Sequence, residues 1–296
     1  MNKSALPSED RAPQAVTIDT IVPADMAARA EESGVRRAAM DALTVLVLSV
    51  LAGAFISFGA IFATTVSAGS AGLPYGVGRL LTGIVFSTGL ILVVVGGAEL
   101  FTGNNLIVMA WASGKVKTRS VLVNWVVAFT GNCIGAVATA GLMFYSTQYT
   151  FGSGAVGLAA LATANGKVSL AFVPALTLGI MCNALVCLAV WMCFSARTTI
   201  DRVVTIVPPV AAFVAAGFEH SIANVYFIPM GLFIKAGAGS AFWDSIGKTA
   251  ADYPALTWTN FIFGNLIPVT VGNLIGGSLL VGAVYWYVYL RKREAP

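Results

Sequence analysis

Two adjacent side chains, Glu219 and His220, can exchange protons although they stand in the middle of an apolar stretch. His220 is the only histidine among the 296 residues, and imidazole is the side chain whose charge changes closest to neutral pH. An ionisable group is expensive to place in an apolar span, so its presence there indicates a function by default. An isolated core histidine can also be purely structural; we favour function here because the flanking sequence GFEHSIAN interrupts the apolar pattern.

Glu219 lies in one of two stretches with similar sequences. The first is GGAELFTGNN at residues 96–105, and the second is AGFEHSIAN at residues 216–224. Identical residues recur at identical offsets, namely Gly97, Glu99, Asn104 and Lys115 in the first and Gly217, Glu219, Asn224 and Lys235 in the second. The matched positions favour a scaffold role for Glu99, Glu219, Asn104 and Asn224, in which they accept hydrogen bonds from interrupted backbone or anchor a partner subunit.

A second pair of segments also repeats with constant internal spacing. Its members are Asn124, Gly131, Asn132, Ile134 and Gly135, followed later by Asn265, Gly272, Asn273, Ile275 and Gly276. Two matched segments make coincidence a poor explanation, and internal repeats of this kind are typical of membrane transporters. The chain is therefore predicted to consist of two related halves.

The composition places these halves in a membrane. Hydrophobic residues make up 57% of the chain and charged residues 10%, whereas a soluble domain has about 25% charged residues. The basic residues form no patch with interleaved aromatic residues, so nucleic-acid binding is not expected. The four cysteines and the single histidine show no metal-ligand spacing, and we expect neither a metal nor another cofactor.

The apolar stretches predict six membrane spans in an all-α fold. They cover about 41–67, 77–112, 120–147, 169–195, 203–235 and 258–290. The second and fifth are too long for one straight helix, and each contains one of the two polar stretches, so both are predicted to be broken. Each half holds three spans, an odd number, so the second half enters the membrane from the opposite side and the 3+3 repeat is inverted.

The short connections give the orientation. Lys115, Lys117 and Arg119 follow the second span, and further basic residues follow the fourth and sixth. By the positive-inside rule these connections and both termini are cytoplasmic. We expect a cytoplasmic and helical N-terminal arm over 1–40, a channel domain over 41–291 and a short cytoplasmic tail over 292–296.

Breaking a helix in hydrocarbon leaves backbone groups without partners, so irregular backbone survives only against protein or a watery cavity. Two matched breaks therefore predict one central pathway. The N-terminus of a half-helix offers N–H donors and a positive dipole end, which favour an anion. Thr102 in the first break supplies a hydroxyl that could meet such a cargo, although a threonine can also merely cap a helix.

Four segments strongly resemble the formate/nitrite transporter family: GFEHSIAN, NLIPVTVGNLIGG, GGAELFTGNN and DMAARAEESGV. The similarity covers nearly the whole chain. It implies an aquaporin-like protomer with six transmembrane segments, broken second and fifth helices, and a homopentamer in which each protomer has its own pore. It also implies the inner membrane of a bacterial cell as the location, with lipids, protons and further copies of the chain as partners.

The resemblance assigns a central hydrogen-bonding relay and an anion-attracting cation. The relay would consist of Thr102, His220 and Asn183, the last within GIMCNALVCLAVW. Lys167, in NGKVSLAF, would attract anions on the periplasmic side; the alternative is a solvated interface charge.

The resemblance also assigns two apolar constrictions, Phe86 and Phe213, with Leu90 and Leu100 nearby. A constriction of this kind penalises a bare anion, because it removes hydration without replacing it. The pore would therefore favour the conjugate bases of weak acids, which His220 could protonate or whose charge it could steady. Plain core packing is the alternative for both phenylalanines.

Together these observations predict a pH-dependent channel for formate and related small monovalent anions. Nitrite or hydrosulfide is the alternative cargo, and the sequence alone does not separate them or exclude lactate. A membrane enzyme using Glu219 and His220 as an acid/base pair is disfavoured, because no nucleophile, metal set or cofactor loop accompanies them. A water or glycerol pore is opposed by the absence of paired Asn-Pro-Ala sequences.

Overall fold

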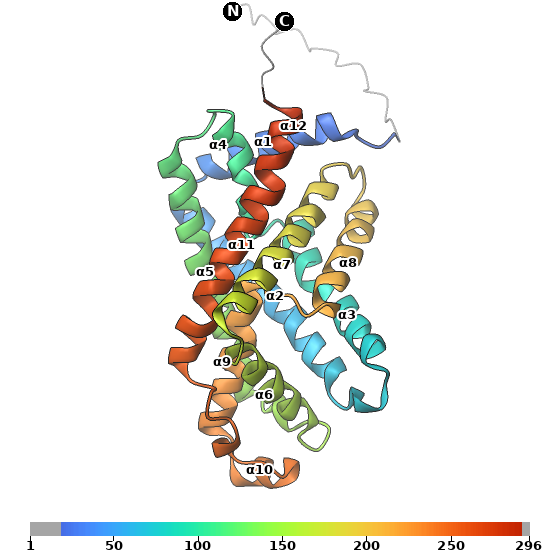
Figure 1. Ribbon diagram of the computed structural model, residues 1–296, viewed down its shortest axis with the longest axis vertical. Helices are drawn as coiled ribbons and strands as arrows, with labels where there is room; N and C mark the ends of the chain where they lie inside the picture. The colour runs from blue at the N-terminus through green and yellow to red at the C-terminus, as the bar shows by residue number, and fades with distance from the viewer. Residues whose placement is uncertain (1–18, 292–296) are drawn as a thin grey trace, which may run out of the picture.

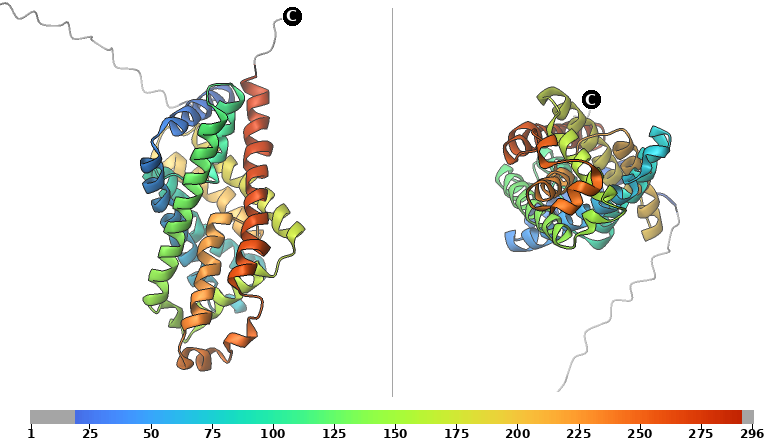
Figure 2. Two further views of the ribbon diagram at one scale, coloured as in Figure 1. Left: turned by 90° about the vertical axis from the view of Figure 1, so that its left-hand side faces the viewer. Right: turned by 90° about the horizontal axis from the view of Figure 1, so that it is seen from below.

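The computed structural model describes residues 19–291, and over these residues the chain forms helices and no strand (Figure 1). The first eighteen residues of the expected arm and the expected tail at 292–296 lie outside the described residues. The helices run mostly along the long axis of the molecule, with α1 across one end and α10 at the other (Figure 2). We call these the α1 end and the α10 end.

The first half of the chain contains two long helices, a broken one and the short helices that connect them. Its elements are α1 (Pro23–Ala39), α2 (Ala42–Ser67), η1 (Ser70–Gly72), α3 (Tyr75–Gly96), η2 (Gly103–Ile107), α4 (Val108–Ala112), α5 (Thr118–Tyr145) and η3 (Gln148–Thr150). The second half begins with a helix that the sequence analysis did not predict. Its elements are α6 (Ala155–Val168), α7 (Phe172–Cys193), α8 (Thr199–Ala215), α9 (Ser221–Gly237), α10 (Ser240–Ile246), η4 (Ala250–Asp252), η5 (Asn260–Leu266), α11 (Ile267–Leu274), η6 (Ile275–Ala283) and α12 (Val284–Tyr289).

Within residues 19–291, five helices are long and apolar enough to cross a membrane: α2, α3, α5, α7 and the continuous helix Asn260–Tyr289. The remaining span is divided between α8 and α9, of 17 residues each. Helix α9 is long and apolar enough to cross a membrane only when it is taken together with α10, from which it is bent by 112°. Six crossings bring α1 and α12 to the same end, where they lie side by side (Figure 1). The predicted all-α, six-span fold is confirmed.

Both predicted breaks are present, and each begins with a glycine in the left-handed region. Gly97 follows α3 with φ 79°, and Gly217 follows the last residues of α8 with φ 77°. Any other residue would be strained at these angles, because a Cβ there meets the backbone. The matched glycines therefore end the first half-helix in each repeat.

The two repeats also pack alike. A side chain at Gly135 of α5 would run into the backbone of α2 at Val50, and one at Gly276 would run into the backbone of α7 at Ile180. Close helix approach at small residues is how membrane helices gain packing energy, since lipid supplies no hydrophobic drive between them. The glycines repeated in the sequence thus hold the first and third spans of each half together.

The two short helices α1 and α6 are counterparts. Each precedes the first span of its half, and each has a cation in its last turn, Arg37 in α1 and Lys167 in α6. Helix α1 contacts η2 and α4, which follow the first break, while α6 packs against α9, which follows the second. The helix of the N-terminal arm is therefore part of the repeat.

Candidate functional site

His220 connects the two breaks. It precedes α9, and its Nδ1 accepts a hydrogen bond of 3.1 Å from the backbone N–H of Ala223, so it caps the helix. Its Nε2 lies 3.0 Å from Oγ1 of Thr102, which belongs to the first break. A backbone N–H can only donate, so Nδ1 must be the acceptor and the neutral ring carries its proton on Nε2. His220 then donates to Thr102.

The hydrogen bond between His220 and Thr102 is secluded. Only 3% of His220 and none of Thr102 is exposed to solvent. With its oxygen accepting from His220, Thr102 keeps a hydroxyl proton that it can donate elsewhere. A donor whose oxygen already accepts a hydrogen bond is polarised and donates more strongly. The pair can therefore present one strengthened donor to a molecule between the breaks.

Asn183 binds the backbone of Thr102. Its Nδ2 donates to the backbone oxygen of Thr102 at 3.3 Å, to Oδ1 of Asn105 at 2.9 Å and to the backbone oxygen of Asn273 at 2.7 Å. Asn183 makes no hydrogen bond to His220 among the described residues. It thus joins the backbone of the first break to the third span of the second half.

A carboxylate cluster supports the first break. Asn104 donates to Oε2 of Glu99 at 2.7 Å and to Oδ1 of Asn124 at 2.9 Å. Arg37 donates to the same carboxylate at 3.2 Å and to Oδ1 of Asn104, and Asn124 donates to the backbone oxygen of Arg37. The buried charge of Glu99 is therefore balanced by the cation of Arg37 and accepts a hydrogen bond from the amide of Asn104.

The second break has the same cluster. Asn224 donates to Oε2 of Glu219 at 2.7 Å and to Oδ1 of Asn265 at 2.7 Å. Nζ of Lys167 donates to Oε1 of Glu219 at 2.7 Å, and Asn265 donates to the backbone oxygen of Lys167 at 3.0 Å. Lys167, expected to attract anions, has its charge balanced by Glu219.

Two further asparagines satisfy the backbone of the breaks. Asn132 donates to the backbone oxygens of Ser49 and Glu99 and accepts from the N–H of Phe101 at 2.9 Å. Asn273 repeats the three bonds in the second half, donating to the backbone oxygens of Gly179 and Glu219 and accepting from the N–H of Ser221 at 2.9 Å. The sequence repeat contained both residues, but the sequence analysis assigned neither a role.

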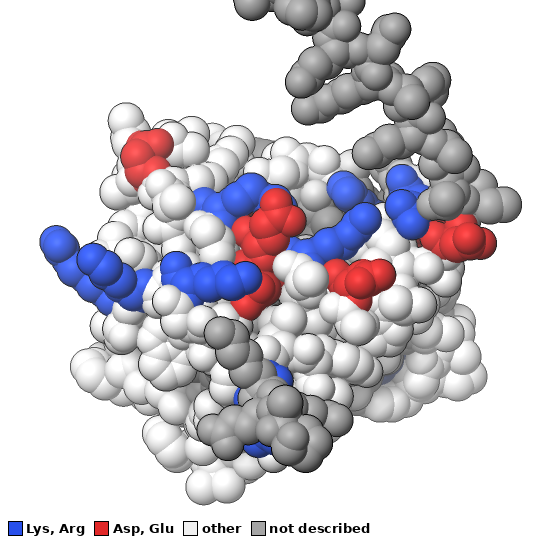
Figure 3. All heavy atoms as spheres, turned by 90° about the horizontal axis from the view of Figure 1, so that it is seen from above, with Lys and Arg blue, Asp and Glu red and all other residues white. Residues whose placement is uncertain are grey.

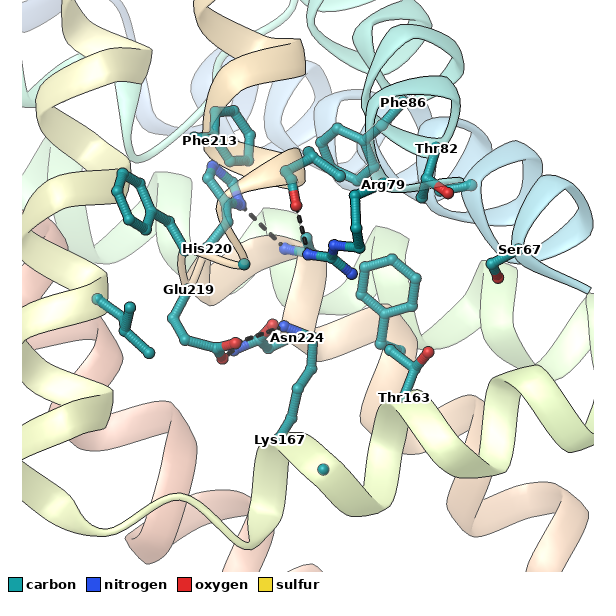
Figure 4. Close-up of a pocket in the computed structure, with 18 of the residues that line it drawn as sticks. Ser67, Arg79, Thr82, Phe86, Thr163, Lys167, Phe213, Glu219, His220 and Asn224 are labelled. Carbon is teal, nitrogen blue, oxygen red and sulfur yellow. Dashed lines mark hydrogen bonds and ion pairs between the residues drawn. The ribbon is translucent and has the colours of Figure 1, made fainter. Parts of the chain in front are cut away.

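A cavity of about 320 Å³ lies beside the second break, toward the α10 end. Phe86, Phe213 and His220 line its inner wall, and Lys167 and Arg79 point into it from opposite sides (Figure 4). A smaller cavity of about 260 Å³ lies toward the α1 end, where Leu90, Leu100, Arg37 and Arg202 are among its lining residues. Neither Thr102 nor Asn183 lines either cavity.

Apolar rings form part of the inner wall of the first cavity. The ring centroids of Phe86 and Phe213 are 5.9 Å apart in an edge-to-face arrangement, and Phe213 stacks on the ring of His220 at 6.2 Å. The two phenylalanines therefore form one layer in mutual contact, whereas the resemblance implied two constrictions. Leu90 and Leu100 face the opposite cavity. The apolar separation is thus built from two different kinds of side chain.

Arg79 is a site residue that the sequence analysis missed. It lies in the first turns of α3, well before the break, and donates from Nε to the backbone oxygen of Ala215 at 3.2 Å and from Nη2 to that of Val214. A lone basic residue near the start of an apolar span was the only available signal. Within residues 19–291 no cluster of three or more His, Cys, Asp or Glu side chains could hold a metal ion.

Comparison with known proteins gives a consistent result. The model of the formate/nitrite transporter family matches residues 24–287. The formate channel FocA of Escherichia coli K12 is 47% identical over 276 residues, which cover 93% of this chain and 97% of that protein. FocA of Haemophilus influenzae is 37% identical, with 90% and 94% covered.

Solved structures are also similar. A pentameric formate channel with formate bound superimposes with a TM-score of 0.81 at 45% identity, covering 84% of this chain and 98% of the other. A further ion channel of the same family has a TM-score of 0.76 at 27% identity, with 89% and 98% covered. The family resemblance inferred from the four sequence segments is confirmed.

Proposed function

The chain belongs to the formate/nitrite transporter family, and from that premise we propose that it conducts formate and similar small monovalent anions of weak acids through a pore within each protomer. The relatives that support this cargo are named formate channels. The observation that carries the proposal is the hydrogen bond between His220 and Thr102, which joins the two breaks next to an apolar layer. The chain moves its substrate without altering it chemically.

The proposed path runs from the larger cavity, past the layer of Phe86 and Phe213, to the cavity that Leu90 and Leu100 face. A bare carboxylate pays a large desolvation penalty in such a layer. Protonating a simple carboxylate of pKa about 3.5 at pH 7 requires about 5 kcal/mol, which is the smaller barrier. The substrate therefore crosses the layer as the neutral acid or with its charge held by a donor.

The geometry around His220 supports the second possibility, in which a hydrogen-bond donor holds the charge of the anion. To take up a further proton, the ring would have to release the N–H of Ala223 from Nδ1. In the arrangement described, His220 instead donates through Nε2 to Thr102, whose hydroxyl proton can bind an oxygen of the anion. His220 thus steadies the charge of the substrate at the centre, and protons reach the carboxylate from water in the cavities.

We also propose the orientation and the assembly. Lysine and arginine side chains gather at the α1 end (Figure 3), where Lys115 and Lys117 lie between α4 and α5 and Arg119 lies in the first turn of α5. The positive-inside rule then makes this end, with the arm over 1–40 and the tail over 292–296, cytoplasmic in a bacterial inner membrane. Large exposed apolar side chains on α2 and α5 suit lipid and neighbouring copies in a homopentamer like the solved relative.

Flux measurements in proteoliposomes test the proposed cargo. Formate, nitrite, hydrosulfide, lactate and chloride are compared at several pH values, and we expect formate flux at least about tenfold above chloride flux, rising as the pH falls. Equal chloride and formate fluxes would show that weak-acid chemistry is not what selects. Nitrite or hydrosulfide flux well above formate flux would move the proposal to the other cargo of the family.

A further inference from the structure

Arg79 is placed to act on an anion, although it lies far from the breaks in sequence. Its guanidinium binds two backbone carbonyls at the end of α8, those of Val214 and Ala215, beside the break that begins at Gly217. A guanidinium carries five N–H donors, and these two bonds involve only Nε and Nη2. Donors on Nη1 remain for a ligand, and Arg79 is partly exposed to the cavity that it lines.

The charge of Arg79 is not balanced by a carboxylate. No Asp or Glu within residues 19–291 lies in ion-pair distance of it, whereas Lys167 in the same cavity is held by Glu219 at 2.7 Å. The carbonyls at a helix end carry only partial negative charge, equivalent to about half an elementary charge. The lining therefore retains a net positive charge, and it is centred on Arg79.

The other cavity repeats the arrangement. It is lined by Arg37, whose charge is balanced by Glu99, and by Arg202, which makes no ion pair among the described residues. When Gly97 is aligned with Gly217, Arg79 corresponds to Thr199 and Arg202 corresponds to Thr82. The two arginines thus sit one helical turn apart in the repeat, on the same face of the first half-helix.

This shift explains why the sequence repeat does not reveal the pair. In the aligned half-helices, an arginine in one half stands opposite a threonine in the other, and the same holds in reverse three residues later. Neither arginine is therefore aligned with the other. Both still reach the cavity beside their own break. Each cavity therefore has one cation that is neutralised within a scaffold and one that is not.

We propose that Arg79 and Arg202 are the anion-receiving residues of the two cavities, each binding a small carboxylate before it reaches the apolar layer. The planar fork of a guanidinium matches the two oxygens of a carboxylate better than an ammonium does. The inference rests on the proposed function, since it assigns the sites at which the proposed substrate is collected. Lys167 is then a structural partner of Glu219.

The test compares Arg79→Gln, Arg79→Lys and wild type in proteoliposomes at low formate concentration. Glutamine keeps amide donors for the carbonyls of α8 and loses the charge, while lysine keeps the charge and loses the fork. Lys248→Gln is the matched control, because Lys248 is an exposed cation at the same end that lines no described cavity. Size-exclusion chromatography in detergent monitors the assembly of each variant.

We expect Arg79→Gln to lower formate flux about threefold to tenfold at low substrate, since a charge that focuses anions in a cleft raises their local concentration by that order or more. Saturating formate should abolish most of the difference. Sodium sulfate that shortens the Debye length from about 30 Å to about 8 Å should lower wild-type flux and leave the Arg79→Gln flux nearly unchanged. Arg79→Lys should retain most of the flux.

Several results would overturn the inference. The first is a wild-type flux that does not depend on salt, and the second is an Arg79→Gln flux equal to that of wild type. The third is an equal loss of flux in Arg79→Gln and Arg79→Lys that persists at saturating formate, which would indicate that Arg79 only caps α8. If wild type prefers formate over chloride while any of these is found, the inference alone fails. If wild type conducts no formate, the proposed function fails with it.

Discussion

Nε2 of His220 and Oγ1 of Thr102 lie 3.0 Å apart and belong to opposite halves of the chain. Each residue comes from a break whose backbone is satisfied by the same set of asparagine bonds, so the inverted repeat brings them together. The repeat does not supply their chemistry, because the residues aligned with Thr102 and His220 are Ile222 and Leu100. The central donor is therefore formed by residues that differ between the two repeats, and the matched asparagine bonds hold these residues in place.

Removing the hydroxyl of Thr102 should affect transport more than assembly. In Thr102→Val the side chain keeps its shape and loses the donor, and we expect formate flux to fall about tenfold, as for loss of one hydrogen bond of about 1–2 kcal/mol in the barrier. Thr102→Ser should retain most of the flux. Equal fluxes in wild type and Thr102→Val at unchanged assembly would refute the role of the hydroxyl.

Substitution of His220 separates its capping from its role at the centre. Asparagine can cap α9 in place of the imidazole, whereas alanine cannot, and loss of a cap costs about 1 kcal/mol. We expect His220→Asn to keep near-native thermal stability and His220→Ala to lose some. Both should lower formate flux, because the histidine ring that donates from Nε2 to Thr102 is gone, while the rise of the flux at low pH should persist, because it comes from protonation of the carboxylate in the cavities. A formate flux equal to that of wild type in both variants would remove His220 from the mechanism.

The ion pair between Lys167 and Glu219 should matter for stability. Truncating one partner of a buried pair leaves an uncompensated charge and costs about 3–5 kcal/mol. We therefore expect Glu219→Gln and Lys167→Met each to lower the thermal stability strongly, and the double variant to lose less than the sum of the two.

The exposed pair Arg36–Glu32, 2.8 Å apart with both side chains more than half exposed, is the control. Glu32→Gln should change stability by less than about 1 kcal/mol. Thermal unfolding in detergent, followed by loss of the native size, measures all four variants. Additive effects of Glu219→Gln and Lys167→Met would mean that the two charges do not stabilise each other.

Asn132 and Asn273 should be equivalent in their effect on folding. Each satisfies two carbonyls and one N–H of broken backbone, and unsatisfied groups in hydrocarbon cost several kcal/mol each. We expect Asn132→Leu and Asn273→Leu to abolish most of the folded yield to a similar extent. A large difference between the two yields would contradict their symmetric roles.

The breaks and the six spans could be predicted because they depend on local signals, namely the length of apolar stretches and the repeated glycines and asparagines. Helix α6 was missed because its sequence, AVGLAALATANGKV, is a short run without charges before Lys167, too short to span a membrane. Arg79 was missed because its partners in α8 are about 135 residues away in sequence. Contacts of that range follow from how the halves meet, which spacing within each half does not encode.

The pairing of Lys167 with Glu219 illustrates the same limit. The resemblance indicated a cation near the pore, and the sequence placed Glu219 at the break, but nothing in the spacing joined them. Their contact depends on α6 packing against α9, and α6 itself was not foreseen. Matched residues in a repeat thus predict a shared scaffold more securely than they predict which charges remain free for a substrate.

The layer of Phe86 and Phe213 should decide which anions are excluded. Because the two rings touch, removing one opens a gap that water can fill, and a hydrated anion then crosses without losing its shell. We expect Phe213→Ala and Phe86→Ala each to raise chloride flux at least about tenfold while formate flux changes little, so that the ratio of formate to chloride falls toward one. Phe242→Ala is the control, since Phe242 of α10 is also buried, packs against Tyr149 of η3 and lines neither cavity. Chloride exclusion that persists in both cavity variants would place the barrier elsewhere, with the leucines of the other cavity as the next residues to vary.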